Sequence, residues 1–332
     1  MNRFRRDRGV ALLTVLLLLA VMSVLVIGVL DDIRFGLRRA GNAQLVGQAQ
    51  WYALGAESLA ATRIGDLQRR DGGRITLQGN WNGHPFVFPI DDAGGADGVV
   101  NARIDDGTTC FNLNSVVEGA GEQWQRREEG ARQFRALLRA LGIAPARANA
   151  LSDVLVDWID SDQDRSDAGA EDADYLALSQ PYRTPGTLLS EPSELRALSG
   201  FDPATYARLR PHVCALPDAR LSPININTLE PHEALLLSML TDNALDPGTA
   251  RRIIASRPAA GWRDIPAFWQ QPLLQAMAPA FEVPEQLAVR TAFFHLQAEV
   301  QYGEAQVALS SLFELDAGGR VRLLARRWTP EE

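Results

Sequence analysis

One long apolar run lies near the N-terminus of the chain. Residues 10–30 contain no charged side chain, and most of them are branched and apolar. A helix of this length spans about 30 Å, which is the thickness of the hydrocarbon core of a bilayer. Beyond it, apolar positions recur at helical spacing to about Leu67. The pattern predicts a single helix over residues 10–70, with its first part, residues 10–30, crossing a membrane.

The pattern then changes to short strands, to helices and back to strands. Alternating or β-rich runs, separated by turns rich in Gly and Asn, occupy residues 74–79, 84–90, 99–105 and 108–116. Helical periodicity dominates residues 124–280. Strand patterns return at residues 287–301, 304–315 and 320–328, and a turn at residues 316–319 predicts that the last two form a hairpin.

Strands occur both before and after the helical block. This order predicts that strands from the two parts of the chain pair in one sheet. The predicted class is therefore α+β. Its sheet comes from residues 71–118 and 284–332, and a helical domain is inserted between them over residues 119–283. Independent α and β domains strung in series are the alternative.

Charge around the apolar run predicts the topology. The leader, residues 1–9, carries four Arg and one Asp, whereas Asp31 and Asp32 follow the run. Because basic residues stay in the cytoplasm, the N-terminus is predicted to be cytoplasmic and the main body to lie across the membrane. A cleaved secretory signal is disfavoured, since the apolar run is too long and no small-residue cleavage site follows it.

Composition argues against two broad functions. The net charge of −8 leaves no excess positive field to neutralise phosphates, so general nucleic-acid binding is not expected. No nucleophile elbow, P-loop, HExxH or dinucleotide fingerprint occurs, and the four His are scattered. The sequence predicts a protein that is not an enzyme.

An acidic stretch after residue 153 predicts a cation site. Residues 153–174 contain nine carboxylates and one cation, Arg165. Within this stretch, four carboxylates have the spacing of an EF-hand calcium loop, namely Asp160, Asp162, Asp164 and Glu171, but Arg165 stands where that loop needs Gly. Dense like charges favour a bound ion, and calcium suits oxygen ligands. We expect a structural calcium ion; a solvated loop without an ion and a calcium sensor remain alternatives.

The chain has two cysteines, Cys110 and Cys214, and both lie in segments expected to be extended. On the outer side of the membrane, oxidising conditions permit a disulfide between them. Two free thiols are the alternative.

The leader resembles a known processing signal. A basic segment ending in Gly9, followed directly by VALLTVLLLL, is similar to the class III signal of type IV pilins and type II secretion pseudopilins. The resemblance implies that prepilin peptidase cleaves after Gly9 and methylates Val10. Most members carry Glu at the fifth mature position, where this chain has Thr14. That departure is typical of the minor pseudopilin branch called the general secretion pathway protein K family.

Three internal motifs extend the resemblance over nearly the whole chain. FNLNSV (residues 111–116) and SPININT (residues 222–228) resemble signatures of the K family, with Leu229 where Ala is usual. DWIDSD, GAED and Tyr175 are similar to its calcium-binding segment. The resemblance implies that Asp160, Asp162, Glu171 and Asp172 bind calcium, with Asp164 as an additional ligand. Asn227 or Thr228 is predicted to cap the helix that follows.

The resemblance also implies a fold and a role. The fold would be that of a pseudopilin, in which a long N-terminal transmembrane helix packs on an antiparallel sheet, with a large inserted all-α domain. The role would be structural: a subunit at the tip of the periplasmic pseudopilus of a Gram-negative type II secretion system, initiating its assembly for protein export. Other minor pseudopilins, the major pseudopilin, prepilin peptidase and the inner membrane would be its partners.

A rival hypothesis rests on the same segment. NINT followed by two helices also resembles a helix-hairpin-helix module, which would make the chain a membrane-anchored DNA receptor. However, residues 241–249 lack the paired Gly that cradle a phosphate, and they contain Asp242 and Asp246. Nucleic acid is therefore not expected among the partners.

Overall fold

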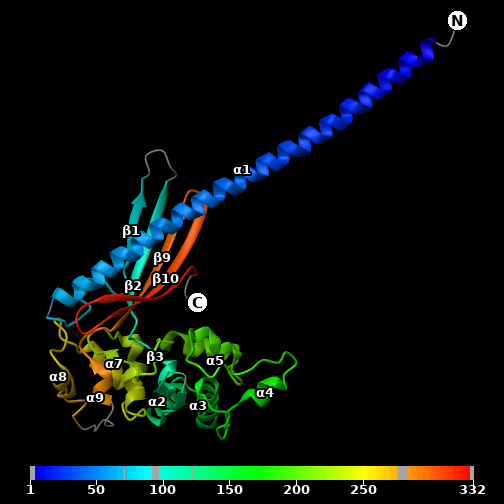
Figure 1. Ribbon diagram of the computed structural model, residues 1–332. Coiled ribbons are helices and arrows are strands. Elements are labelled where there is room, and N and C mark those ends of the chain that lie inside the picture. Colours follow the sequence, from blue (N-terminus) through cyan, green and yellow to red (C-terminus); the bar gives the residue numbers. More distant parts are fainter. Residues whose placement is uncertain (1–3, 71, 92–96, 122, 276–282, 330–332) are drawn as a thin grey trace. The chain divides into compact units, whose positions relative to one another are not determined.

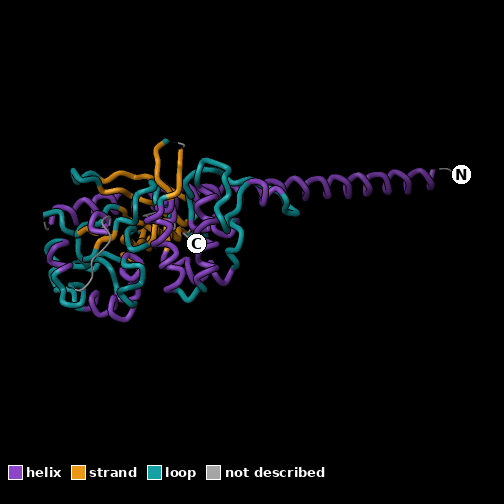
Figure 2. Tube along the Cα trace, turned by 90° about the horizontal axis from the view of Figure 1, so that it is seen from below, coloured by secondary structure: helices purple, strands orange, loops and turns teal. Residues whose placement is uncertain are grey.

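The computed structural model describes residues 4–70, 72–91, 97–121, 123–275 and 283–329. Figures 1 and 2 show the order and type of the elements. Two compact units can be distinguished: residues 1–55, 87–100 and 299–307 form one, and residues 56–86, 101–298 and 308–332 form the other. The predicted leader, the end of the helical block and the last residues of the chain lie partly outside the described residues.

The first element is one unbroken helix, α1 (Phe4–Arg70), as the sequence predicts (Figure 1). Its stretch of highest mean hydropathy, 3.1, is not buried, and it is long and apolar enough to cross a membrane. From residue 49 on, one face becomes buried. That face carries mainly small side chains, which let other elements approach the helix closely: Ala49, Ala53, Ala56, Ala60, Ile64 and Leu67.

Strands from both ends of the chain form one sheet. They are β1 (Pro85–Ile90), β2 (Gly98–Asp106), β9 (Phe293–Tyr302), β10 (Ala305–Leu315) and β11 (Val321–Arg327). Their order is β1-β2-β9-β10-β11, so β9, the first strand of this sheet after the helical block, lies beside β2, its last strand before that block. β10 and β11 form the predicted antiparallel hairpin. The expectation of one sheet with an insertion is confirmed.

Two predicted strands are wrong or shorter than expected. Residues 74–76 have no regular secondary structure and residues 77–79 form a bend and a turn. Ile75 is buried instead of lying in a strand: its N–H donates to the Val289 carbonyl (2.9 Å) and its carbonyl accepts from the Asn225 side chain (3.0 Å). Within residues 108–116, only β3 (Phe111–Asn112) is extended, and residues Leu113–Val116 form a 3-10 turn.

The inserted region is mainly helical but not all-α as predicted. Its helices are α2 (Glu128–Ala140), α3 (Pro145–Ile159), α4 (Asp172–Leu176), α5 (Pro203–Leu209), α6 (Ala234–Leu240), α7 (Pro247–Ala255), α8 (Ile265–Trp269) and α9 (Val283–Gln286). Short strands pair as β3 with β6 (Val213–Cys214), β4 (Val117–Ala120) with β5 (Gln123–Arg126), and β7 (Ile224–Asn225) with β8 (Leu287–Ala288). One apolar cluster extending from Phe111 to Leu287 forms the core of this region.

Two halves of the insertion use the same Asn-x-Asn-Ser/Thr bracket, at residues 112–115 and 225–228. In each bracket the side chain of the first Asn accepts from the N–H of the second, at 3.2 and 2.9 Å. The hydroxyl at the fourth position donates back to the carbonyl of the first Asn, at 2.6 and 3.0 Å. The same sequence pattern therefore folds in the same way twice.

The second Asn of each bracket binds a distant backbone unit through both of its polar atoms. Asn114 accepts from the Leu189 N–H (2.8 Å) and donates to the Leu189 carbonyl (2.9 Å). Asn227 does the same with Trp262, at 2.7 and 2.9 Å. The prediction that Asn227 or Thr228 caps the next helix is wrong, because the turn Pro231–Glu233 is capped by Glu230.

The brackets generate a stability prediction. Asn114→Ala or Asn227→Ala removes at least two buried hydrogen bonds and leaves backbone groups unpaired, so each is expected to lower the free energy of unfolding by about 2–4 kcal/mol. Asn42→Ala, at an exposed position on α1, is the control and should change it by less than about 0.5 kcal/mol. Thermal unfolding of the purified chain measures both; equal stability of all three variants would contradict the assignment.

Candidate functional site

Two helix ends position the acidic loop. α3 ends at Ile159, so Asp160 is its C-terminal flanking residue, and Glu171 is the N-cap residue directly before α4. A ligand oxygen of Asp160, one of Asp162 and one of Glu171 all lie within 4.8 Å of one another. Asp160 and Glu171 are 6% and 4% exposed, whereas Asp162 is exposed. The fold therefore brings together three of the five predicted ligands.

Three buried carboxylate oxygens of this cluster have no hydrogen-bond partner among the described residues. Within the described part of the chain, no partner is found for Oδ1 of Asp160 or for either carboxylate oxygen of Glu171. Burial, together with the carboxylate of Asp162, raises the pKa of Asp160 to about 8. Burial and the carboxylate of Asp157 raise the pKa of Glu171 to about 7. Unpaired buried charges are costly, and a divalent cation is the partner that carboxylates of this geometry accept.

Asp157 was not among the predicted ligands, yet it borders the cluster. It lies one helical turn before Asp160 and is 1% exposed, and its Oδ1 also lacks a partner among the described residues. Its Oδ2 accepts from the Ser166 N–H (3.1 Å). A Cβ on Gly169 would lie 1.8 Å from that oxygen, so only Gly fits there. The i, i+3 spacing of Asp157 and Asp160 on α3 is the sequence signal that could have identified it.

The structure places the other two predicted ligands outside the cluster. Asp172 accepts from the N–H and hydroxyl of Thr184 (2.9 and 3.0 Å) and pairs with Arg183. These contacts hold the start of α4 against the chain that follows the helix. Asp164 is exposed, and its N–H donates to Asp162 (2.8 Å). Arg165, at the position where an EF-hand has Gly, pairs with Asp174 (3.2 Å).

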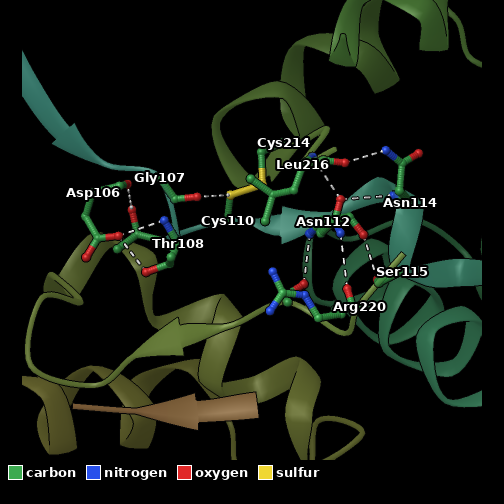
Figure 3. Close-up of a disulfide and its surroundings, with 12 residues drawn as sticks. Asp106, Gly107, Thr108, Cys110, Asn112, Asn114, Ser115, Cys214, Leu216 and Arg220 are labelled. Atoms are coloured by element: carbon green, nitrogen blue, oxygen red, sulfur yellow. Dashed lines mark hydrogen bonds between the residues drawn. A yellow bond between two sulfur atoms is a disulfide. The ribbon is translucent and has the colours of Figure 1, made fainter. Parts of the chain in front are cut away.

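The predicted cysteine pair is joined in the structure. The Sγ atoms of Cys110 and Cys214 lie 1.99 Å apart, and the bond closes a loop with a sequence separation of 104 (Figure 3). The parallel pairing of β3 and β6 places Asn112 opposite Cys214. Asn112 also donates to the carbonyls of Asp218 (2.9 Å) and Arg220 (3.1 Å), so hydrogen bonds and the disulfide hold the same two segments together.

The predicted processing residues Gly9 and Val10 lie within α1. The hydroxyl of Thr14 donates to the Ala11 carbonyl (2.9 Å), as hydroxyls commonly do inside helices. Cleavage after Gly9 and methylation of Val10 stay predictions.

The hairpin of the rival DNA hypothesis presents carboxylates that are already engaged. Asp242 pairs with Arg139, and Asp246 caps α7 by accepting from the Thr249 N–H (3.0 Å). Two acidic groups at this turn repel a phosphate.

Comparison with known proteins identifies the family. Two family models, both described as type II secretion system (T2SS) protein K, match residues 109–218 and 224–290. Type II secretion system protein K of Aeromonas hydrophila is 35% identical over 97% of both chains, and that of Klebsiella pneumoniae is 38% identical over 93% of both. The chain belongs to the type II secretion system protein K family. The resemblance stated from sequence is thereby confirmed.

A solved structure supports the fold of this chain. A chain in the crystal structure of the GspK-GspI-GspJ complex from the enterotoxigenic Escherichia coli type 2 secretion system is 30% identical and superimposes with a TM-score of 0.74. The match covers 88% of this chain and 99% of that chain. The predicted α+β fold class is confirmed, and the DNA-receptor alternative receives no support.

The raised pKa values of the cluster predict how stability depends on pH. Carboxylates of the unfolded chain lose their protons at about pH 4, whereas Asp160 of the metal-free folded chain loses its proton at about pH 8. Between these two pH values the folded state binds more protons than the unfolded state. The metal-free chain should therefore lose stability as pH rises through this window. The double substitution Asp160→Asn and Glu171→Gln should flatten this dependence in thermal unfolding with a chelator present.

Asp167→Asn, at an exposed position of the same loop, is the matched control and should keep the slope of the parent chain. The same slope in the double variant as in the parent chain would show that the cluster does not titrate as described.

Proposed function

We propose that this chain is a minor pseudopilin that starts the periplasmic pseudopilus at its tip and thereby serves protein export without catalysing a reaction. The observation that carries the proposal is the match, over 88% of this chain, to a chain of a complex named for GspK, GspI and GspJ. The corresponding minor pseudopilins would be its immediate partners. The major pseudopilin would add below them.

The N-terminal helix supports this role. The apolar side chains of residues 10–30 are exposed, Leu17 by 64% and Val24 by 69%, and such a surface requires lipid or neighbouring helices. The Arg-rich leader would keep the N-terminus in the cytoplasm, with the body in the periplasm. Prepilin peptidase would cut after Gly9 and methylate Val10. Thr14 would then provide no carboxylate to neutralise the terminal amine of another subunit, which suits a subunit that starts a filament.

Co-expression tests the assembly. The full chain, purified in detergent with its GspI-type and GspJ-type counterparts, should elute as one equimolar complex in size-exclusion chromatography with light scattering. A complex of the two counterparts that forms and excludes this chain would contradict the proposal. A salt-titrated gel shift with duplex DNA serves as the control for the rival function, and no shift is expected.

We further propose that Asp160, Asp162 and Glu171 hold a structural calcium ion. Support comes from their convergent oxygens, from the unpaired buried oxygens of Asp160 and Glu171, and from the all-oxygen donor set, which suits calcium. The ion would offset the repulsion within the cluster and tie the end of α3 to the start of α4. Asp157 would lie next to this ion. Asp172 would not bind the ion but would stabilise the loop through its hydrogen bonds with Thr184.

Calcium is expected to raise the thermal midpoint of the chain, because an ion that binds only the folded state at 100 times its Kd contributes about 2.7 kcal/mol. Asp160→Asn with Glu171→Gln should abolish the shift. Asp172→Asn is the matched control: it should lower stability through loss of the Thr184 contacts but retain the calcium shift. No shift in the parent chain, or a full shift in the double variant, would contradict the site.

A further inference from the structure

A stretch of α1 between the apolar run and the packed part of the helix has no support from other elements. Residues 31–44 are all exposed, and burial on this side of the body begins only at Ala49. Among the residues that the structure describes, none outside α1 forms a hydrogen bond, an ion pair or a ring contact with residues 31–48. The helical form of this linker segment, residues 31–48, therefore depends on its own side chains and on its neighbours in the helix.

Glycine makes the linker segment a weak helix. Gly36, Gly41 and Gly47 fall within twelve residues. Gly is the least favourable residue in a helix interior apart from Pro, because its backbone loses the most freedom on folding. A Cβ at any of the three positions would meet no atom within 4 Å. Close packing against another described part of the chain is thus not the reason for these glycines.

Charge weakens the linker segment further. Arg34 and Arg38 lie four residues apart, and like charges at this spacing are neighbours on a helix and destabilise it. Asp31 lies 3.8 Å from Arg34, but both side chains are about 70% exposed, so their attraction is small. The other acid, Asp32, and Arg39 have no opposite charge three or four residues away. The segment therefore lacks the side-chain pairs that stabilise an isolated helix.

Both flanks of the linker segment are held more firmly. On one side, residues 10–30 would lie in the bilayer, where a broken backbone hydrogen bond finds no water to replace it. On the other side, the ring of Tyr52 packs on that of Tyr302 with centroids 5.5 Å apart, and Glu57 binds two strands of the sheet. Local opening of α1 is therefore confined to the segment between them.

We propose that residues 36–47 form a hinge, at which α1 opens locally so that the body turns relative to its membrane anchor. A helical stretch of this length without tertiary contacts is marginal in water, even with better helix formers than these. The hinge lets an anchored subunit sample orientations before it meets its partners. This use of the hinge rests on the proposed function, whereas the opening itself is a property of the chain alone.

Hydrogen exchange of the full chain in detergent tests the opening. Amides of residues 37–48 should exchange about tenfold faster, or more, than those of residues 52–66 of the same helix. Gly36→Ala with Gly41→Ala should slow this exchange roughly twentyfold, since each such change in a helix interior shifts the local equilibrium about fivefold. Gly55→Ala is the matched control in the packed part, where an added Cβ also meets no atom within 4 Å, and should leave the exchange of residues 37–48 unchanged.

Distances across the linker segment distinguish a hinge from small fluctuations of a straight helix. Spin labels at Leu30→Cys and Thr62→Cys would lie about 48 Å apart in a straight helix. Double electron–electron resonance should give a broad distribution that extends to shorter distances in the parent chain. With Gly36→Ala and Gly41→Ala, the distribution should become narrow and centre near the distance of the straight helix.

Three results would each overturn the proposal. The first is exchange in residues 37–48 that is as slow as in residues 52–66. The second is an unchanged exchange rate in the double alanine variant, and the third is an equally narrow distance distribution in both chains. Neither measurement requires a partner, so failure of the hinge and failure to form a complex with the GspI-type and GspJ-type counterparts can be told apart.

Discussion

The buried carboxylate of Asp106 connects the point where the chain leaves the sheet with the point where it returns. It accepts from the N–H and hydroxyl of Thr108 (2.7 and 2.5 Å) after β2 and from the hydroxyl of Thr291 (2.5 Å) before β9. Thr291 in turn accepts from Asn225 of the second bracket (3.0 Å). Burial raises the pKa of Asp106, against the lowering effect of these hydrogen bonds. The end of β2, the residue before β9 and the second bracket are thus all linked through the carboxylate of Asp106. The same contacts therefore hold β2 next to β9 and fix where the insertion begins and ends.

The two brackets differ in the length of chain that precedes the residue each of them binds. This difference explains why the acidic loop is the part of the insertion that would need an ion. Only a short segment separates α7 from Trp262, the residue held by the second bracket. In the first half, by contrast, the acidic loop and α4 lie between α3 and Leu189. This additional segment has no counterpart in the other half, so it must supply its own stabilisation. Asp172 closes this segment through Thr184, and the proposed calcium ion would pair with the oxygens of Asp160 and Glu171 that have no partner among the described residues.

Features that depend on local pattern were predictable from sequence, and features that depend on distant contacts were not. The long helix, the β10–β11 hairpin and the convergence of Asp160, Asp162 and Glu171 follow from periodicity, turn residues and spacing. Residues 74–79 have strand-like composition, but Ile75 forms hydrogen bonds with Asn225 and Val289 and lies in an irregular segment instead. Asn227 has the propensity of a cap, yet Trp262, far along the chain, takes both of its polar atoms. Asp164 matches the spacing of a ligand, but its side chain stays exposed.

A filament subunit needs a helix that is fixed to its body at one end and unpartnered at the other. Glu57 supplies the fixed end, because its carboxylate accepts from Ser311 (2.7 Å) and from Arg326 (2.8 Å) of two sheet strands. Burial opposes ionisation of Glu57, but the hydrogen bonds of Arg326 and Ser311 outweigh it and lower the pKa. Although Arg326 is exposed, the Glu57 carboxylate is buried, and we interpret this pair as setting the register of α1 on the sheet. Residues 10–44 of the same helix have no buried position. Their apolar side chains are therefore free to exchange lipid for neighbouring helices without any change in the contacts that hold the body.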